Sequence, residues 1–267
     1  MAQIDHIRSR ANAWLKDLRR LAHEGAAYRK QGQVWLEGEH LLQAAVAAGR
    51  RLQTLVLAES QAEALLPRWQ PQAERTVVVA DGLWREFTAL ESPAGLGALL
   101  AWQGTDGWRA GRPTVVLDRL QDPGNVGSIL RSAAALGFEQ VLALSGCVAL
   151  WSGKVLRAGM GAHFGLQLYE SVAPEALAGL QLPLLATSSH AGQALHEQML
   201  PWPCAWLFGH EGQGLAPELL AQASLSLRII QPGGQESLNV AAAAAICLHA
   251  SAVSAPGRGA GRDGAGL

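Results

Sequence analysis

The chain contains few residues that could crosslink its fold or bind a metal ion. Its 267 residues include only three cysteines, Cys147, Cys204 and Cys247, which are odd in number and far apart in the sequence. None of them has a partner at the spacing of a metal site. We therefore expect no metal, and we interpret the cysteines as buried free thiols.

The chain also lacks a long uninterrupted apolar segment. Residues 1–20 have no apolar core of the kind that a signal peptide needs. The most apolar window, around Leu238–Val253, is interrupted by Asn239 and His249, so it is not typical of a membrane span. We expect a cytoplasmic protein with no membrane partner.

Two common phosphate-binding loops are absent as well. The glycine-rich segment Leu207–Leu215 lacks the Gly-Lys-Ser/Thr ending of a Walker loop and does not fit the dinucleotide fingerprint G-x-G-x-x-G. The glycines at Gly159, Gly161 and Gly165 miss that fingerprint by one residue. A nicotinamide-dependent oxidoreductase is therefore only a remote alternative.

Charge is sparse and unevenly distributed. Charged residues make up 16% of the chain and the net charge is −1, but residues 1–30 hold seven basic side chains against three acidic ones. Basic side chains neutralise phosphates and release counterions, which is consistent with a phosphate-bearing partner. An ordinary solvated helix face would carry the same charges, so charge alone does not decide.

The length fits about two domains, and we assign residues 1–103 to a smaller mixed α/β domain. Its first element is an amphipathic helix predicted over Ile7–Leu21, where apolar residues recur at helical spacing. Strands are predicted at Val34–Gly38, Leu52–Leu57, Thr76–Val79 and Gly95–Trp102, and helices at Glu39–Ala48, Ala62–Trp69 and Asp81–Phe87. Residues 104–113 combine glycine, proline and charge, which predicts a linker.

Residues 114–255 are predicted to form a second domain with a parallel sheet. Apolar strands alternate with helices, the pattern of a sheet covered on both faces. The predicted strands are Thr114–Leu117, Val141–Leu144, Leu166–Tyr169, Leu184–Ala186, Ala205–Phe208 and Leu225–Ile230, and the predicted helices are Val126–Leu136, Lys154–Gly159, Pro174–Leu180 and Pro217–Ala223. Residues 256–267 have nothing to bury and are predicted to be a disordered tail.

The last helix follows a Pro-Gly-Gly loop and has almost no polar face. Such a helix must be buried on nearly every side, and Ala241–Ala245 lets neighbouring backbones approach closely. Ser237 is the candidate N-cap, with Asn239 in the first turn, where unpaired N–H groups are exposed.

Two further strand-to-helix loops carry polar residues. Asn125 is a plausible N-cap, and Arg131 lies among apolar residues, where it would need a partner or a cavity. In Leu207–Leu215 the glycines let the backbone approach a ligand, and Glu211 supplies a charge. Ligands of parallel sheets bind at the carboxyl ends of the strands, so we expect the three loops to converge on one site.

Taken in order, the patterns N-x-G-x-x-x-R, G-x-E-G-x-G and S-L-N-V resemble the three motifs of the SpoU/TrmH family of RNA ribose 2′-O-methyltransferases, in the SPOUT superfamily. The resemblance covers residues 113–253. Residues 4–101 are similar to that family's substrate-binding domain, an RNA-binding module shared with certain ribosomal proteins, chiefly through Ser9, Asn12, Lys16 and Val34–Gly38.

The resemblance implies a catalytic domain with a deep trefoil knot, a rare exception to unknotted chain connectivity. It implies a homodimer formed through that domain, with S-adenosylmethionine as cofactor. The implied catalytic residues are Arg131, Asn125, Glu211, Ser237 and Asn239. The implied cofactor-binding residues are Thr187, Gly209, Ile229, Gln231 and Leu238. We expect RNA contacts from Arg8, Arg10, Lys16, Arg19, Arg20 and Arg157.

In this family the reaction is a displacement in which a ribose 2′-hydroxyl attacks the methyl carbon of the sulfonium. The family assigns the central role to the position of Arg131, but a guanidinium is always protonated in proteins and is a poor base. We hypothesise that Arg131 stabilises the developing alkoxide and fixes the target phosphate, while the proton passes to phosphate, water or Glu211.

Three residues depart from the family pattern. His210 stands where many members have Asn, Ile230 where many have Pro, and Gly159 where Ser is common; we interpret His210 as a residue that structures its loop. The expected substrate is structured RNA, most of all ribosomal RNA. Alternatives are transfer RNA, methylation of a base, and a non-catalytic RNA-binding or assembly factor with the same fold.

Overall fold

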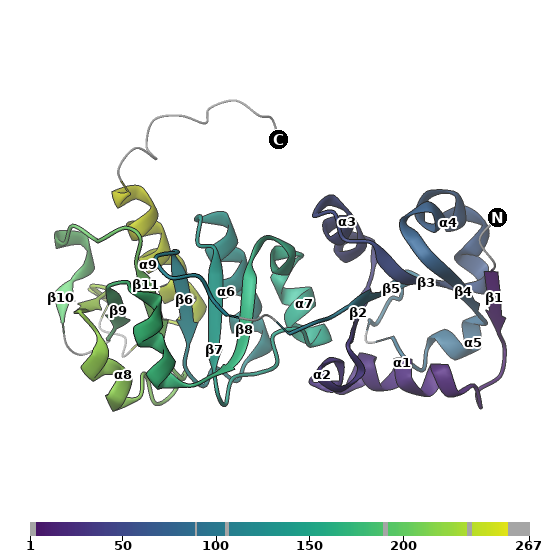
Figure 1. Ribbon diagram of the computed structural model, residues 1–267, viewed down its shortest axis with the longest axis horizontal. Coiled ribbons are helices and arrows are strands. Elements are labelled where there is room, and N and C mark those ends of the chain that lie inside the picture. Colours follow the sequence, from purple (N-terminus) through teal and green to yellow (C-terminus); the bar gives the residue numbers. More distant parts are fainter. Residues whose placement is uncertain (1–3, 89, 105–106, 189–191, 234–236, 256–267) are drawn as a thin grey trace, which may run out of the picture. The chain divides into compact units, whose positions relative to one another are not determined.

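The computed structural model describes residues 4–88, 90–104, 107–188, 192–233 and 237–255. Its contacts divide the chain into two compact units (Figure 1). Unit 1 comprises residues 1–104 with residues 149–165, and unit 2 comprises residues 105–148 with residues 166–267. The predicted tail, residues 256–267, lies outside the described residues.

Unit 1 contains a mixed sheet with the strand order β1-β4-β3-β5-β2 within the described residues. The first three strands of that order are parallel, and β5 runs antiparallel to both β3 and β2. The strands are β1 (Ile4–Ile7), β2 (Gln33–Glu37), β3 (Leu52–Ala58), β4 (Ala73–Val79) and β5 (Leu96–Ala101). Helices α1 (Ala13–His23), α2 (Ala27–Gln31), α3 (Glu39–Ala47), α4 (Ala62–Trp69) and α5 (Asp81–Trp84) accompany the sheet.

The predicted helix Ile7–Leu21 begins six residues too early. Ile7 belongs to β1, which pairs with β4 and buries this side chain. The side chain of Asn12 then accepts a hydrogen bond from the backbone N–H of Leu15 (3.3 Å), and α1 begins at Ala13. The N-cap therefore decides where the helix starts, although the apolar spacing extends beyond it.

Helix α7 (Gly153–Gly159) packs with unit 1, although its sequence lies within the predicted 114–255 domain. Leu156 is part of the buried core of unit 1, and Trp151 and Phe164 pack against that core. Ser152 caps the helix by accepting from the N–H of Val155. The segment from Ala149 to Gly165 thus interrupts the sequence of unit 2 and contributes to the core of unit 1.

Unit 2 is built on a parallel sheet with the order β10-β12-β9-β11-β6-β7-β8 among the described strands. The strands are β6 (Thr114–Leu117), β7 (Gln140–Leu144), β8 (Gln167–Val172), β9 (Leu184–Thr187), β10 (Gln193–Ala194), β11 (Ala205–Phe208) and β12 (Leu225–Arg228). The helices are α6 (Pro123–Ala135), α8 (Pro217–Gln222) and α9 (Val240–Ser254), and α6 packs beside α9. The predicted helix Pro174–Leu180 is a 3₁₀ helix.

Helix α9 is not buried on nearly every side, as we had predicted from its composition. Ala244, Cys247, Leu248 and Ser251 are buried, and Ser251 Oγ accepts a hydrogen bond from Trp206 Nε1 (2.8 Å). On the opposite face Ile246 is 42% exposed and Val253 is 64% exposed. The single chain therefore leaves one apolar face of this helix in solvent.

Two of the three thiols are buried as predicted, and Cys147 is half-buried. Burial raises the pKa of Cys204 to about 11 and that of Cys247 to about 12. Burial likewise raises the pKa of Cys147 to about 11. These thiols are protonated and unreactive at neutral pH. Within the described part of the chain, no helix is both long and apolar enough to cross a membrane.

Candidate cofactor and catalytic site

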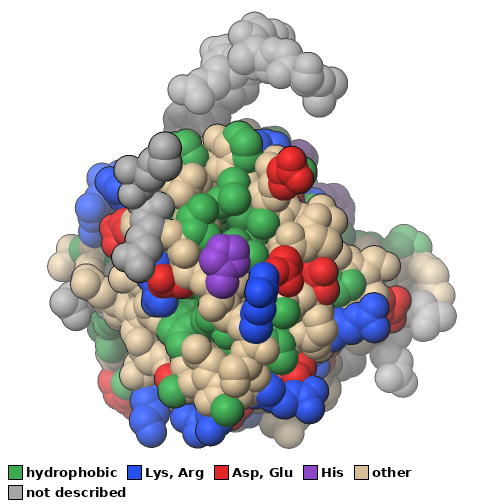
Figure 2. All heavy atoms as spheres, turned by 90° about the vertical axis from the view of Figure 1, so that its right-hand side faces the viewer, with side chains coloured by type: hydrophobic (Ala, Val, Ile, Leu, Met, Phe, Trp, Pro, Cys, Tyr) green, Lys and Arg blue, Asp and Glu red, His purple; other side chains and the backbone are tan. Residues whose placement is uncertain are grey.

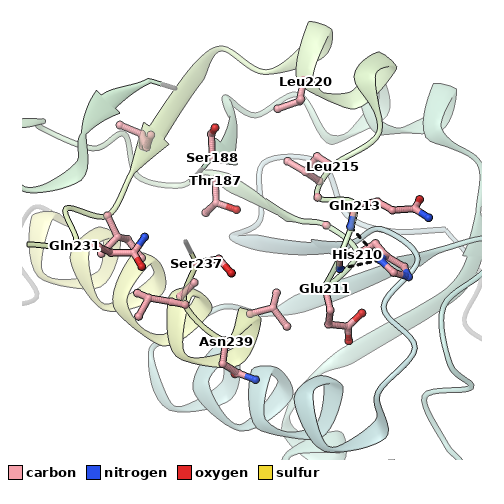
Figure 3. Close-up of a pocket in the computed structure, with 18 residues that line it drawn as sticks. Thr187, Ser188, His210, Glu211, Gln213, Leu215, Leu220, Gln231, Ser237 and Asn239 are labelled. Carbon is pink, nitrogen blue, oxygen red and sulfur yellow. Dashed lines mark hydrogen bonds between the residues drawn. The ribbon is translucent and has the colours of Figure 1, made fainter. Parts of the chain in front are cut away.

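A cavity of about 590 Å³ opens in unit 2 at the carboxyl ends of the parallel strands (Figure 3). The residues after β9, β11 and β12 line it, together with the first turn of α9. Eight of the residues implied by the family resemblance are among those that line it: Thr187, Gly209, Glu211, Ile229, Gln231, Ser237, Leu238 and Asn239. Asn125 and Arg131 do not line it.

The loop Gly209–Gly214 has a tightly folded backbone. The N–H of Gly214 donates to the carbonyl of His210 (2.8 Å), and His210 Nδ1 accepts from the N–H groups of Gly212 (3.0 Å) and Gln213 (3.2 Å). A Cβ at Gly209 would lie 2.3 Å from the carbonyl carbon of Gly214, which leaves room only for glycine. The structure confirms His210 as a residue that structures this loop.

Asn239, and not Ser237, is the N-cap of α9. Its Oδ1 accepts hydrogen bonds from the N–H groups of Ala241 (2.9 Å) and Ala242 (3.2 Å). Ser237 lies two residues before the cap and is exposed at the cavity. Serine and asparagine cap helices about equally well, so the sequence did not distinguish them.

Asp122, and not Asn125, is the N-cap of α6. Its Oδ1 accepts from the N–H of Asn125 (2.7 Å), and Pro123 occupies the first helical position, where a missing N–H costs nothing. The helix therefore begins three residues earlier than predicted. The side chain of Asn125 is left available for other contacts.

Asn125 joins the three motif loops through hydrogen bonds. Its Oδ1 accepts from Asn239 Nδ2 (2.9 Å), and its Nδ2 donates to Glu211 Oε1 (3.3 Å). The same Glu211 oxygen accepts from the N–H of Asp122 (3.3 Å). One residue from each predicted motif thus meets the others in a continuous network, with Asn239 and Glu211 at the cavity.

Glu211 is held in its ionised form. Partial burial raises the pKa of its carboxyl group, but hydrogen bonds from its own N–H, from the Asn125 amide and from the backbone of Asp122 and Gln121 outweigh burial, and the pKa falls below its ordinary value. Hydrogen bonds to a carboxylate favour the charged form. Among the described residues that line the cavity, Glu211 is the one with a carboxylate.

Arg131 lies on the exposed face of α6, and not in a cavity of the single chain. Ile129, Leu130 and Ala133 occupy the buried face of the helix, whereas Arg131 shares the outer face with Ser128. With the described residues it forms no hydrogen bond or ion pair. Its guanidinium is therefore available to a partner from solution.

Asp118 and Arg119 do not line the cavity but contact the loop that does, although the sequence analysis did not select them. Arg119 Nε and Nη2 donate to the two oxygens of buried Asp118 (2.8 and 2.9 Å), and its guanidinium also reaches Gln213 Oε1 (3.1 Å) and the carbonyl of Gly214 (3.3 Å). Asp118 Oδ2 accepts from the N–H of Ala216 (2.9 Å). The pair therefore holds the end of the Gly209–Gly214 loop against the end of β6.

Neither residue carried a signal strong enough to identify it in advance. Arg119 adopts a positive φ of 56°, which is uncommon for a side chain of this size, but backbone angles are not visible in sequence. Hydrogen bonding to Asp118 raises the pKa of Arg119. Asp118 directly follows a buried strand, and that position was the only available indication.

The residues predicted to contact RNA lie in unit 1, and most of them pair with acids. Arg8 contacts Glu59 (2.6 Å), Arg10 and Arg19 both contact Glu86, and Arg20 contacts Asp17 (3.6 Å). Lys16 is exposed and Arg157 is half-buried on α7. On the face shown in Figure 2, basic and acidic side chains are interspersed. RNA contact by these residues stays a prediction.

Comparison with known proteins agrees with this geometry. Residues 112–249 match the SpoU rRNA Methylase family. An uncharacterized tRNA/rRNA methyltransferase of Synechocystis sp. is 35% identical over 259 residues, which cover 93% of each chain. The 23S rRNA (guanosine(2553)-2′-O)-methyltransferase RlmP of Bacillus subtilis is 27% identical, covering 91% of this chain and 97% of its own.

A similar structure is the AdoMet-bound rRNA methyltransferase from Sinorhizobium meliloti. Its TM-score is 0.81 at 25% identity, and the alignment covers 94% of this chain and 98% of that one. The similarity therefore includes unit 1 as well as the parallel sheet. The motif network, the family match over residues 112–249 and the relative that is 35% identical lead to one conclusion. The chain belongs to the SpoU rRNA methylase family.

Proposed function

We propose that the protein transfers a methyl group from S-adenosylmethionine to a ribose 2′-hydroxyl of structured RNA, with ribosomal RNA as the expected substrate. The hydrogen-bonded network of Asn239, Asn125 and Glu211 carries the proposal, because it assembles the three motifs beside one cavity. The relatives support it, since their names describe RNA methylation, one of them at a ribose 2′-oxygen.

The cavity suits this cofactor in size and chemistry. Its volume of about 590 Å³ lies within the range of roughly 300–1000 Å³ that is typical of small-molecule sites. Leu227, Ile229 and Leu238 provide apolar walls, the loop at Gly209 brings backbone groups close, and Glu211 supplies a negative charge. When bound, the cofactor supplies an electrophilic methyl group on a positively charged sulfur.

The low pKa of Glu211 argues against it as the proton acceptor. A carboxylate whose pKa lies below the ordinary value is a weak base at neutral pH. We assign it instead to holding Asn125 in place and to an electrostatic role beside the positively charged sulfur. The ribose proton then passes to phosphate or water as the new O–C bond forms and the C–S bond breaks.

Arg131 is assigned to the RNA. Its exposed guanidinium, which has no partner among the described residues, can donate two parallel hydrogen bonds to a phosphate and stabilise the developing alkoxide. Ser237 is exposed at the cavity two residues before Asn239. We keep it as a candidate contact for the substrate.

Substitution of Arg131 tests the proposal. We expect Arg131→Ala to bind S-adenosylmethionine normally but to lose methyl transfer by roughly 100-fold or more, as when a group that stabilises transition-state charge is removed. Arg131→Lys keeps the charge and loses the planar pair of donors, so it should also be strongly impaired. The control is Arg112→Ala, which removes an exposed arginine of unit 2 that pairs with Glu139.

Near-normal turnover by Arg131→Lys would contradict the planar role of Arg131. RNA binding without methyl transfer by the unmodified protein would favour an assembly factor instead. Comparing ribosomal RNA with transfer RNA as substrate in the same assay identifies the RNA class.

The finer features of the family remain part of this proposal. We expect residues 114–255 to form a trefoil knot, residues 1–103 to bind RNA, and the protein to act in the cytoplasm. We also expect a homodimer formed through unit 2, because α9 exposes the apolar side chains of Ile246 and Val253. An exposed apolar face of this kind is typical of an interface.

A further inference from the structure

His210 uses one ring nitrogen to hold the backbone of the Gly209–Gly214 loop. Its Nδ1 accepts hydrogen bonds from the N–H groups of Gly212 (3.0 Å) and Gln213 (3.2 Å), which Figure 3 draws as dashed lines. Every residue of this loop lines the cavity. The imidazole therefore fixes the conformation of one wall of the cavity through backbone groups.

These two hydrogen bonds require a neutral imidazole. A ring nitrogen that accepts hydrogen bonds carries no proton, so the proton of the neutral ring is on Nε2. In a protonated imidazole both ring nitrogens carry a proton and both are donors. A protonated His210 would direct the N–H of Nδ1 at the two backbone N–H groups, so the ring and the loop would have to separate.

Histidine is the side-chain type whose charge changes between pH 5 and 8, whereas carboxyl and guanidinium groups keep their charge over most of that range. The charged groups next to the loop are of the second kind. Among the described residues they are Glu211 within the loop, Asp118 and Arg119 at the end of β6, Asp122 before α6, and Glu218 on α8, whose charge acts on Arg119. His210 is thus the described group at the cavity that is of a type able to respond to pH in this range.

We propose that His210 is a positioning residue whose neutral imidazole holds the Gly209–Gly214 loop in the conformation that binds the cofactor, so that a proton on the imidazole weakens cofactor binding. The inference rests on the proposed function and deepens it, because it makes the affinity for the cofactor depend on the protonation of one side chain. By linkage, binding of the cofactor in turn favours loss of that proton.

Calorimetric titration with S-adenosylhomocysteine tests the proposal without any turnover. We expect the dissociation constant of the unmodified protein to rise roughly tenfold from about pH 7.5 to about pH 5.5, because the binding-competent loop is restricted to molecules with a neutral imidazole. Binding in this range should also release protons. Titrations repeated in buffers of different ionisation enthalpy measure that release directly.

Two variants separate the hydrogen-bond acceptor from its titration. His210→Asn keeps a side-chain oxygen that can accept from the loop and does not titrate, so the dependence of its affinity on pH and its proton release should both be lost. His210→Leu removes the acceptor, so it should bind weakly at both pH values. Thermal unfolding of each variant at both pH values shows that it is folded.

His196→Asn is the matched control, because His196 is an exposed histidine of unit 2 that does not line the cavity. It should retain both the change in affinity with pH and the proton release of the unmodified protein. Loss of both effects in His210→Asn, with both retained in His196→Asn, supports the role of His210.

Equal affinity of the unmodified protein at the two pH values, or the same change with pH in His210→Asn, would overturn the role of His210 and leave the proposed function intact. Failure of the unmodified protein to bind S-adenosylhomocysteine at either pH would instead contradict the proposed function, and the role of His210 with it. The two failures are therefore distinguishable in a single set of titrations.

Discussion

At the scale of single residues, the ionisation of Glu211 depends on its neighbours. Its hydrogen bonds with Asn125 and with backbone N–H groups exist in the folded state and lower its pKa below the ordinary value of 4.5. A carboxyl group whose pKa is lower in the folded state stabilises that state above the unfolded pKa. The contribution disappears as the pH falls through the folded pKa.

We therefore expect Glu211→Gln to destabilise the protein at neutral pH and to have a smaller effect in acid. The carboxylate is exposed, so the difference in free energy of unfolding should stay below about 1 kcal/mol. Urea unfolding of both proteins between about pH 3 and pH 7 measures it. A difference that grows on acidification below pH 4.5 would contradict the direction of the pKa shift.

Sequence identified which residues meet at the site better than it identified their atomic roles. Asn125, Glu211 and Asn239 were all predicted to converge, because parallel strands bring their loops to one edge. The capping roles of Ser237 and Asn125 were wrong, since several small polar residues cap equally well and the choice depends on local backbone angles. Arg119 was missed because its positive φ and its contacts with Asp118 and Gln213 leave no pattern in the sequence.

At the scale of secondary structure, α9 connects stability to the site through its N-cap. Asn239 satisfies two N–H groups of the helix with its oxygen and contacts Asn125 with its nitrogen. These two functions belong to different atoms of one side chain. Substitutions can therefore separate them.

We expect Asn239→Ala to lose about 1 kcal/mol of unfolding free energy, the usual cost of a lost cap. Asn239→Asp keeps the capping oxygen and should retain the stability, but it cannot donate to Asn125 and should lower methyl transfer as strongly as Asn239→Ala. Denaturant unfolding and a methyl-transfer assay measure the two effects. Full activity of Asn239→Asp would show that the contact with Asn125 is dispensable.

Asn12→Ala provides the control for this pair. Asn12 caps α1 in unit 1 through the N–H of Leu15, so its loss should cost a similar free energy. It should leave the affinity for S-adenosylmethionine unchanged, because Asn12 does not line the cavity.

Strands were easier to predict than helix boundaries and short elements. The strands β6, β7 and β11 are buried along their whole length, and their short apolar segments are typical of buried parallel strands. The strand β10 has two residues and no pattern to read. Helix α1 begins directly after its N-cap, Asn12, although apolar residues recur at helical spacing from Ile7 onward.

At the scale of the whole molecule, the two units share the chain in a way that sequence did not predict. Domain boundaries were placed on the assumption that each domain is one continuous segment. The structure instead packs residues 149–165 with unit 1, because Leu156, Trp151 and Phe164 contribute to its core. Apolar side chains are typical of the core of any domain, so composition could not show which of the two units these residues join.

The exposed face of α9 predicts an interface between two copies of the chain. We expect the unmodified protein to have the mass of a dimer in light scattering, and Ile246→Glu with Val253→Glu to shift it toward the monomer, because burying two unpaired carboxylates is costly. Met199→Glu changes an apolar residue that is 97% exposed and should leave the mass unchanged. A monomeric unmodified protein would contradict the interface.

The most direct test of the proposed activity is to identify the product. The protein would be incubated with S-adenosylmethionine that carries an isotopically labelled methyl group and with RNA from cells that lack the protein. The RNA would then be digested to nucleosides and analysed by mass spectrometry. We predict a labelled 2′-O-methylnucleoside that is absent with Arg131→Ala; label on a base, or no label in RNA, would contradict the assignment as a ribose methyltransferase.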